Sequence, residues 1–378
     1  MTTNPFKPMS GAVPPLLVGR EAALAELADS FDNGPGAPAR LALFTGARGV
    51  GKTVMLTETE LLARRRGWAT VAGTANKGLI GELVAAIGAA ATDFPRKKKR
   101  ASRVRGVTLP SVLGVGGGGI ELAGPAAETP VGSFRAAMNQ LLDLVEPAGV
   151  GVLVTVDEVH GVARDDLRQV AIDFQHLVRD GRNVALALAG LPAAITDLLN
   201  DHVLTFLRRA VPFHLGRLDT GDVAAALRAT IEDGGRGVSD EALALMTDAV
   251  AGYPFMLQLV GYYTWRQATG EEIDVAAAEG GIPIARDRLG SAVLATALAD
   301  VSPTDRAYVS AMAQDEGPSR TGEIADRLGF TAARAGQHRA RLIAAGIIEP
   351  AGHGLVDLSL PFLRAYARAH LNGPQLTP

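Results

Sequence analysis

The residues best suited to chemistry form one glycine-rich run near the start of the chain. The run fits the pattern G-x-x-x-x-G-K-[ST] in full, with Gly46, Ala47, Arg48, Gly49, Val50, Gly51, Lys52 and Thr53. Its glycines let backbone N–H groups face a phosphate, and the helix N-terminus that follows adds positive potential. Lys52 would reach the β- and γ-phosphates, and the Thr53 hydroxyl would bind Mg²⁺. The pattern predicts a site for a Mg²⁺–nucleoside triphosphate.

A second chemical signal is an acid pair directly after an apolar run. Asp157 and Glu158 follow Val152–Val156. Asp157 would hold Mg²⁺ through water, and Glu158 would orient and activate the attacking water. Strands often end in acids, so the pair gains its weight from the glycine-rich run. The adjacent glutamate favours NTPases in which one further strand lies between the loop strand and the Asp strand, rather than the GTPase type.

Alternating apolar runs and amphipathic stretches must position these residues. Continuous apolar runs predict buried strands of the parallel type, and helical patterns lie between them. The predicted strands are 40–45, 68–72, 150–156 and 184–189. The predicted fold class is therefore α/β, with a parallel sheet sandwiched by helices.

Composition limits what else the chain can be. With 378 residues, two or three domains are expected. Cysteine is absent, which excludes disulfides, a thiol nucleophile and thiolate metal sites. No secretory signal is visible and no apolar run reaches the roughly 20 residues that span a bilayer. We expect a soluble, cytoplasmic protein without a membrane partner.

The nucleotide motifs and the segment Leu17-Val18-Gly19-Arg20-Glu21 together resemble AAA+/STAND-type P-loop ATPases, in particular origin-recognition-complex-like initiators and archaeal ATPases. The resemblance covers roughly residues 16–290. It implies ATP hydrolysis with Mg²⁺, an adenine pocket at Val18 and Gly19, and a helical lid after Leu218 that contacts the nucleotide at Pro254. The predicted parts are a flexible arm (1–15), an ATPase core (16–216) with a basic and glycine-rich insertion (about 95–122), the lid (217–300), a winged helix (301–372) and a tail (373–378).

Two departures from the family pattern bear on the rate of ATP hydrolysis. The strand 184–189 ends in Ala189-Gly190, where a polar residue that senses the γ-phosphate is expected. The lid carries Gly252-Tyr253-Pro254, which resembles the G-x-P motif of STAND proteins, where an arginine is usual. Both departures predict slow or partner-gated hydrolysis.

Three further residues have competing interpretations. Arg208 and Arg209 lie where such families place an arginine finger for a neighbouring subunit, although surface arginines are common in this chain. His160 completes the pattern D-E-x-H of helicases, but other helicase signatures are missing. We expect His160 to be a loop residue that supports the site, and a processive translocase fits poorly.

The C-terminal segment resembles a winged helix-turn-helix domain, with a third helix over 331–345 and a wing around Gly352-His353-Gly354. Four side chains of the third helix share one face and could contact duplex DNA: Arg334, Gln337, His338 and Arg341. A basic run, Arg96–Arg100 with Lys97, Lys98 and Lys99, is either a second nucleic-acid contact or a solvated, flexible loop.

These signals predict an ATP-dependent switch that binds duplex DNA and changes the lid angle or an oligomer of itself. The alternative is a signalling STAND ATPase whose winged helix docks protein, as a brake or an effector site. Near-neutral charge favours this alternative, because eight arginines oppose seven acids from residue 302 onward.

Overall fold

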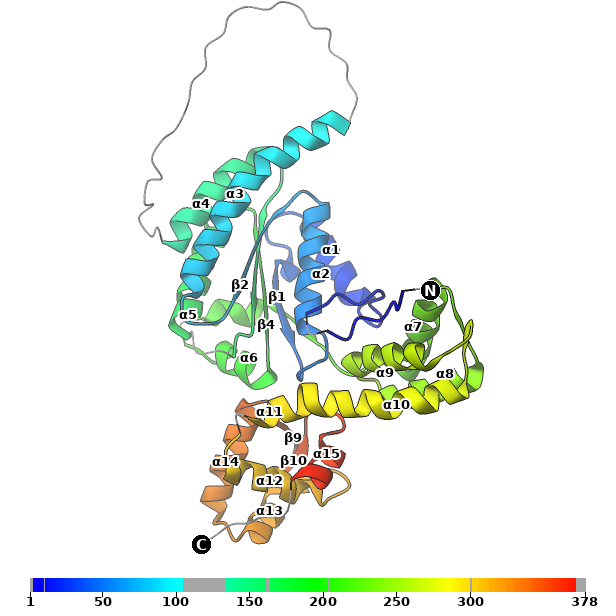
Figure 1. The fold of residues 1–378 in the computed structure, drawn as a ribbon. Coiled ribbons are helices and arrows are strands. Elements are labelled where there is room, and N and C mark those ends of the chain that lie inside the picture. Colours follow the sequence, from blue (N-terminus) through cyan, green and yellow to red (C-terminus); the bar gives the residue numbers. More distant parts are fainter. Residues whose placement is uncertain are drawn as a thin grey trace, which may run out of the picture.

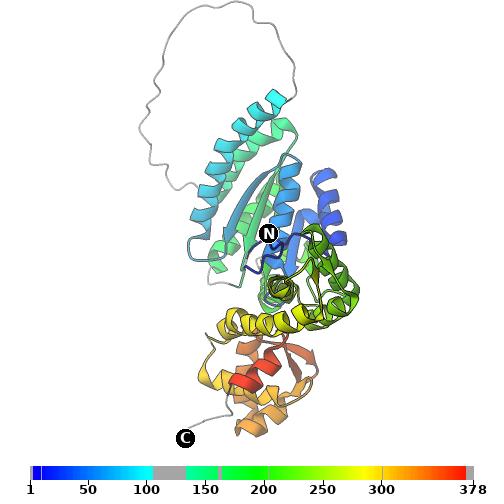
Figure 2. The same cartoon turned by 45° about the vertical axis from the view of Figure 1, so that its right-hand side comes forward.

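Three parts follow one another along the chain: a sheet-containing core, a helical part called the lid after its predicted role, and a C-terminal unit (Figure 1). The computed structural model describes residues 3–9, 11–104, 133–160, 164–202, 204–299 and 301–371. The predicted tail (373–378) lies outside them. A long helical segment runs beneath the core and connects the lid to the C-terminal unit, as both ribbon views show (Figure 2). No helix in the described part of the chain combines the length and apolar composition needed to cross a membrane.

The core is built on a five-stranded sheet in which every neighbouring pair is parallel, in the order β2-β3-β4-β1-β5. β4 lies between the strand that precedes the glycine-rich loop and the strand that ends in Asp157. The predicted additional strand is therefore confirmed. The strands are β1 (Leu41–Thr45), β2 (Ala69–Thr74), β3 (Val152–Asp157), β4 (Val184–Gly190) and β5 (Val211–His214).

Helices cover both faces of the sheet (Figure 1). On one face, the side chains of α1 (Glu21–Asp32) and α2 (Lys52–Arg65) pack in one hydrophobic cluster. A second cluster joins the other face to α3 (Leu79–Val104), α4 (Phe134–Val145), α5 (Arg164–Arg179) and α6 (Pro192–Leu199). Short 3₁₀ turns occupy Pro38–Arg40, Glu146–Ala148 and Thr205–Arg209.

The alternation along β4 explains how the loop helix reaches the sheet. Ala185, Ala187 and Ala189 face the cluster that holds α2, whereas Val184, Leu186 and Leu188 face the other side. Successive side chains of a strand point to opposite faces, so one face of β4 is lined by methyl groups alone. We infer that these small side chains let α2 lie close against the sheet, which places its N-terminus at the strand ends.

The lid consists of α7 (Thr220–Asp233), α8 (Asp240–Val250), α9 (Pro254–Gln267) and α10 (Val275–Leu289), with a two-stranded sheet of β6 (Gly237–Val238) and β7 (Glu272–Ile273). α10 continues through a π-helical turn (Gly290–Leu294) into α11 (Ala295–Ala299).

The expected flexible arm packs on the lid instead. Phe6 is only 2% exposed, and a Cβ at Gly261 of α9 would lie 2.2 Å from its ring. The Lys7 N–H donates to Gln258 Oε1 (2.9 Å) and the Asn4 amide donates to the Tyr262 carbonyl (3.0 Å). The prediction of a free arm is wrong for these residues, because one buried aromatic ring leaves no periodic pattern.

The C-terminal unit contains α12 (Pro303–Ala313), α13 (Thr321–Leu328), α14 (Ala332–Ala344) and α15 (Leu363–His370). Its antiparallel sheet has the order β8-β10-β9, from β8 (Ser319–Arg320), β10 (Leu355–Leu358) and β9 (Ile348–Gly352). Two of the unit's contacts with the rest of the molecule are made at glycines. A Cβ at Gly346 would lie 2.8 Å from Leu191 of the core, and one at Gly290 would lie 3.2 Å from Tyr366.

The backbone of the basic run is helical and does not form a loop. α3 extends to Val104, beyond the predicted end at Ala91, so Lys97, Lys98 and Lys99 lie on the last turns of a helix. Their side chains and residues 105–132, with most of the predicted insertion, lie outside what the structure describes.

Candidate active site

The glycine-rich loop connects the end of β1 to the start of α2, and its backbone requires glycine at two points. Gly46 has φ +158°, and a Cβ there would lie 2.4 Å from the Leu215 carbonyl oxygen. Gly49 has φ +74°, and its Cβ would lie 1.9 Å from the Tyr253 hydroxyl. No side chain fits at either position. The loop therefore presents backbone at the N-terminus of α2, where the helix dipole favours an anion.

Lys52 is the first residue of α2, and its ammonium lies against the backbone of the loop. Its side chain is buried (8% exposed), and Nζ donates to the Gly46 carbonyl (3.0 Å) and the Ala47 carbonyl (2.7 Å). Burial lowers the pKa of the Lys52 ammonium, which the nearby carboxylates of Glu158 and Asp157 partly oppose. A buried cation held by neutral carbonyls suits a phosphate as its further partner.

Thr53 and Asp157 come from α2 and β3 and meet at the same edge of the sheet. The Thr53 hydroxyl donates to Asp157 Oδ2 over 2.6 Å. Mg²⁺ is usually bound by one or two protein oxygens together with water and phosphate oxygens, and this pair fits that donor set. No group of three metal-ligating side chains occurs among the described residues, so the phosphates of ATP would complete the shell.

Glu158 is held in an uncommon conformation. Its φ is +56°, in the left-handed region, and its N–H donates to Asp157 Oδ1 (2.8 Å). His160 Nε2 lies 2.6 Å from Glu158 Oε2. This hydrogen bond lowers the pKa of the Glu158 carboxyl, against the effect of partial burial. Non-glycine residues in this backbone region store about 1–3 kcal/mol and cluster at functional sites.

A cavity of about 520 Å³ lies over the loop, and its size suits a nucleotide. Most of the predicted loop residues line it, as do Val18, Glu158 and Pro254, whereas Gly19 lies beside Asp222 of the lid. The cavity also has walls that the sequence did not predict. These come from the amino-terminal segment, from α9 and from the helix that leads to the C-terminal unit: Lys7, Met9, Gln258, Ala292, Val293 and Thr296.

Tyr253 joins the lid to the loop. Its side chain is fully buried, and the hydroxyl donates to the Arg48 carbonyl over 2.9 Å. Burial raises the pKa of this phenol well above its usual value, so it stays protonated and keeps donating. Pro254 follows as the first residue of α9, where a proline is well tolerated. The sequence marked the Gly-x-Pro pattern but gave no role to the tyrosine between its ends.

Comparisons with known proteins agree with this geometry. Residues 16–188 match the family model of the AAA ATPase domain. The chain therefore contains an AAA ATPase domain. Residues 291–367 match a domain of unknown function (DUF8462), and a search of curated proteins finds no match.

Solved structures show the same fold as the ATPase at low sequence identity. The Walker-type ATPase PABY2304 of Pyrococcus abyssi is 17% identical with a TM-score of 0.68, over 95% of this chain and 100% of that one. The ORC2 protein of Aeropyrum pernix in ADPNP–ADP complexes is 14% identical with a TM-score of 0.62, over 96% of each chain. The ADP form of ORC2 is also similar, at 14% identity and a TM-score of 0.55, over 97% of this chain and 99% of that one. These likenesses show a P-loop NTPase fold.

The ATPase has no polar side chain at the end of β4. Gly190 occupies that position, and a Cβ there would lie 2.4 Å from Val159 Cγ2. Val159 follows the acid pair, so an apolar contact fills the place where the family pattern has a γ-phosphate sensor.

Arg208 and Arg209 lie at the opposite edge of the sheet from the ATPase site. They end the 3₁₀ turn before β5, both are exposed, and Arg208 Nε donates to the Leu199 carbonyl (2.8 Å). Val211 of β5 pairs with Ala42 near the start of β1, whereas the glycine-rich loop follows the end of β1. A strand of this length spans roughly 16 Å. The two arginines cannot serve their own nucleotide, and an arginine-finger role is open to them only across a subunit interface.

The predicted DNA-reading face of the third helix is only partly available in the ATPase. His338 is 6% exposed and its ring stacks on Phe330, with centroids 5.1 Å apart. Its Nδ1 lies 2.5 Å from Asp305 Oδ1, and Arg341 also bonds Asp305. The prediction that His338 contacts DNA is therefore wrong. Helical spacing placed it beside exposed neighbours, but it points toward α12 and serves the domain core.

We expect Asp305→Asn to lower the free energy of unfolding by about 1.5–3 kcal/mol at neutral pH, because a hydrogen-bonded charge is lost. Burial raises the pKa of Asp305, but hydrogen bonds from Ser302, His338 and Arg341 outweigh it and leave the pKa below its usual value. A lowered pKa contributes stability that is present above the unfolded-state value and lost as pH falls through the folded-state value. Urea unfolding at pH 7 and at pH 3 should therefore show a difference between wild type and variant that shrinks in acid. A difference that grows in acid would contradict this assignment.

Proposed function

We propose that this ATPase is a nucleotide-dependent switch that binds duplex DNA through its C-terminal unit, acting as a winged helix-turn-helix. The observation that carries the proposal is α14, which follows α12 and α13 in the order of such domains and precedes the β9–β10 hairpin. α14 contains no acid, and its first turns are exposed. A third helix of this kind is the element that enters the major groove in helix-turn-helix proteins.

Three side chains of α14 suit DNA. Arg334 stacks on Phe330, with its guanidinium carbon 4.2 Å from the ring centroid, and stays exposed. Gln337 is exposed one turn later. Arg341 bonds Asp305 but its side chain is still 54% exposed. Arginine and glutamine can hydrogen-bond base edges or phosphates. Lys97, Lys98 and Lys99, on the end of α3, remain candidate phosphate contacts.

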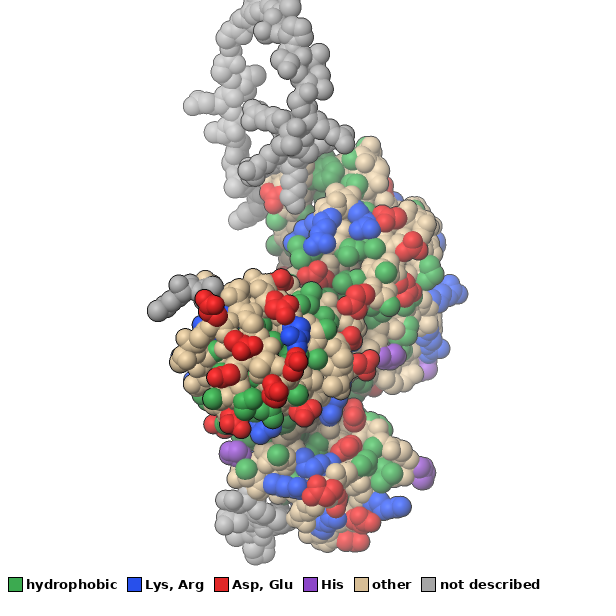
Figure 3. All heavy atoms as spheres, turned by 90° about the vertical axis from the view of Figure 1, so that its right-hand side faces the viewer, with side chains coloured by type: hydrophobic (Ala, Val, Ile, Leu, Met, Phe, Trp, Pro, Cys, Tyr) green, Lys and Arg blue, Asp and Glu red, His purple; other side chains and the backbone are tan. Residues whose placement is uncertain are grey.

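Charge on the lid limits where DNA could lie. Acidic side chains gather on the face of the lid that Figure 3 presents. The exposed acids of the lid come from α7, α8, β7, α10 and the adjoining turns, and they include Glu232, Asp233, Asp240, Glu241, Asp248, Glu271, Glu272 and Glu279. Such a surface repels the phosphate backbone. The proposal therefore places DNA on α14, away from the lid.

We expect the protein with Mg²⁺-ATP to bind a fluorescent duplex at low salt. Each phosphate contact contributes about −0.9 to the slope of log affinity against log salt, so Arg334→Ala with Arg341→Ala should shallow that slope. Replacing Lys97–Lys99 by alanine should weaken binding to duplexes of every sequence about equally, because phosphate contacts carry no sequence information. Arg286→Ala, an exposed arginine of α10, is the matched control. Anisotropy titrations that show no duplex binding at low salt would overturn the DNA proposal.

Protein docking is the second candidate, and the seat of the C-terminal unit on the core favours it. Gly346 lies against Leu191, so the end of α14 is already occupied by protein. The wing also carries Glu349, whose pKa is raised by burial and by Asp357. An acid there suits a phosphate backbone poorly. In this reading the unit is the effector site or brake of a STAND-type signalling ATPase, and its boundaries (301–372) remain a prediction.

A trans role for Arg208 and Arg209 predicts ATPase activity that rises more than linearly with protein concentration. A hydrolysis-dead Glu158→Gln subunit supplies intact arginines, whereas an Arg208→Ala/Arg209→Ala subunit supplies an intact site. Mixing the two should recover activity at hybrid interfaces, because the arginine would neutralise charge on the transferred phosphate. Concentration-independent specific activity in a sample shown to be monomeric would exclude this role.

A further inference from the structure

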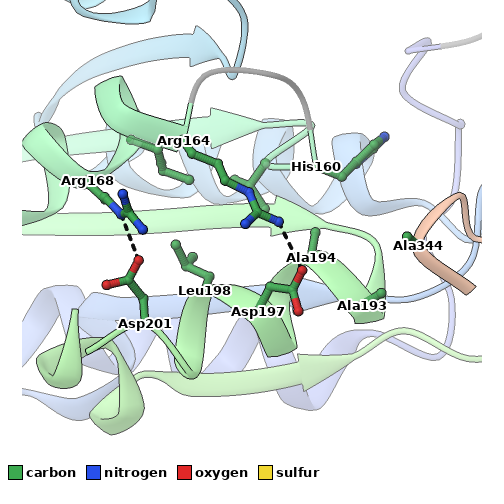
Figure 4. A pocket seen from close by; sticks show the side chains of 11 residues that line it. His160, Arg164, Arg168, Ala193, Ala194, Asp197, Leu198, Asp201 and Ala344 are labelled. Carbon is green, nitrogen blue, oxygen red and sulfur yellow. Dashed lines mark hydrogen bonds and ion pairs between the residues drawn. The ribbon is translucent and has the colours of Figure 1, made fainter. Parts of the chain in front are cut away.

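A second, smaller cavity of about 130 Å³ shares one wall residue, His160, with the nucleotide cavity. Figure 4 shows the side chains that line it. Two ion pairs flank it, Arg164 with Asp197 (3.0 Å) and Arg168 with Asp201 (2.7 Å). Its other walls combine three parts of the molecule: Val159 and His160 after β3, Ala193 and Ala194 of α6, and Ala344 of α14. The C-terminal unit therefore contributes a wall to a cavity whose lining begins directly after the acid pair.

His160 stands in the wall between the two cavities, because its side chain lines both. On the nucleotide side, its Nε2 lies 2.6 Å from Glu158 Oε2, and the imidazole is only 20% exposed. Its Nδ1 is buried and has no hydrogen-bond partner among the residues that the structure describes. One ring thus connects the expected base to the space under the C-terminal unit.

A partner that fixes the carboxylate of Glu158 would help it act as a base. Half of its side chain is exposed, and a glutamate has several rotatable bonds that leave its carboxylate free to move. The bond to His160 occupies Oε2 and leaves Oε1 available for water. A fixed carboxylate matters because general-base catalysis requires hydrogen-bond geometry with the attacking water.

The position of His160 depends in turn on α6 and α14. Val159, next to His160, fills the space at Gly190, and its N–H donates to the Ala189 carbonyl (3.0 Å). Leu191, which follows Gly190, is the N-cap of α6 and contacts Gly346 after α14. A shift of the C-terminal unit would therefore move packed side chains that hold the His160 loop.

We propose that His160 is a positioning residue for ATP hydrolysis, which orients the carboxylate of Glu158, and that the docked C-terminal unit keeps His160 in place. The inference rests on the proposed assignment of Glu158 as the base. It gives the ATPase a route by which a ligand of the C-terminal unit sets the hydrolysis rate without touching the nucleotide.

His160→Ala should lower kcat by about ten- to a hundredfold, since misplacing a catalytic group costs up to about a hundredfold. KM for ATP should stay unchanged, because the loop and Lys52 hold the phosphates. His160→Gln should recover most of the rate, because its amide can donate to Oε2. His202→Ala, an exposed histidine outside both cavities, is the control.

Ala344→Trp tests the contribution of the C-terminal unit. Ala344 is exposed on α14, so a bulky side chain there should leave the unit folded but separate it from α6. The substitution should lower kcat in the wild-type background and have no further effect in His160→Ala, because coupled residues are non-additive. Ala340→Trp, one turn earlier on an exposed position, should have little effect.

A readout independent of turnover is the imidazole ¹⁵N spectrum of His160, assigned by its loss in His160→Gln. Glu158→Gln and Ala344→Trp should each shift this resonance, and Ala340→Trp should not. If Glu158→Gln abolishes turnover but His160→Ala has the wild-type kcat, the positioning role is wrong while the base assignment stands. If Ala344→Trp lowers kcat equally in both backgrounds, the route through His160 is wrong. If Glu158→Gln turns over normally, the base assignment itself fails.

Discussion

Glu158→Gln should bind ATP as tightly as the wild type and hydrolyse it about 10²–10⁴ times more slowly. The amide keeps the shape of the side chain but cannot accept a proton from water. Binding should persist because Lys52, Thr53 and Asp157 remain in place. The left-handed backbone at Glu158 is unaffected by the change, so the loop that carries His160 should keep its conformation.

Phosphate release measures the hydrolysis rate, and calorimetric titration with Mg²⁺-ATP measures the affinity separately. Glu26→Gln, on the exposed side of α1, is the matched control for loss of one carboxylate and should leave both unchanged. A wild-type rate in Glu158→Gln would mean that another group activates the water. Loss of affinity together with rate would instead assign Glu158 to the binding of Mg²⁺-ATP.

The parts of the site that could be predicted from sequence are those that depend on local chemistry. A phosphate-binding loop requires glycines and a lysine at fixed spacing, so residues 46–53 alone are enough to identify it. The buried strands are equally readable, because both faces of a parallel sheet are covered and their runs are continuously apolar. The short edge strand β5 was not predicted, because Val211-Pro212-Phe213-His214 carries a proline and has only one buried residue.

The other misses share one physical cause, which is contact between segments distant in sequence. Tyr253 meets Arg48 across 205 positions, and Asn4 meets Tyr262 across 258. His338 is buried by Asp305 and Phe330. Helical spacing does not predict how the elements that carry these residues pack against α14. A period of 3.6 places residues on a face, but it does not say which face the neighbouring helix covers. That information exists only in the packed structure.

Lys52→Ala should weaken ATP binding by about a hundredfold or more, because two charge-assisted hydrogen bonds are worth at least about 3 kcal/mol. The apo protein should not be destabilised: burial lowers the pKa of this ammonium, so holding it charged inside the loop costs folding energy when no phosphate is bound. At a ligand concentration of 100 Kd, ATP stabilises the wild type by about 2.7 kcal/mol. The same concentration should stabilise the variant by only about 0.4 kcal/mol. Melting curves with and without Mg²⁺-ATP measure this, and the exposed Lys77→Ala is the control. An unchanged ATP-dependent shift in Lys52→Ala would show that the loop backbone alone holds the phosphates.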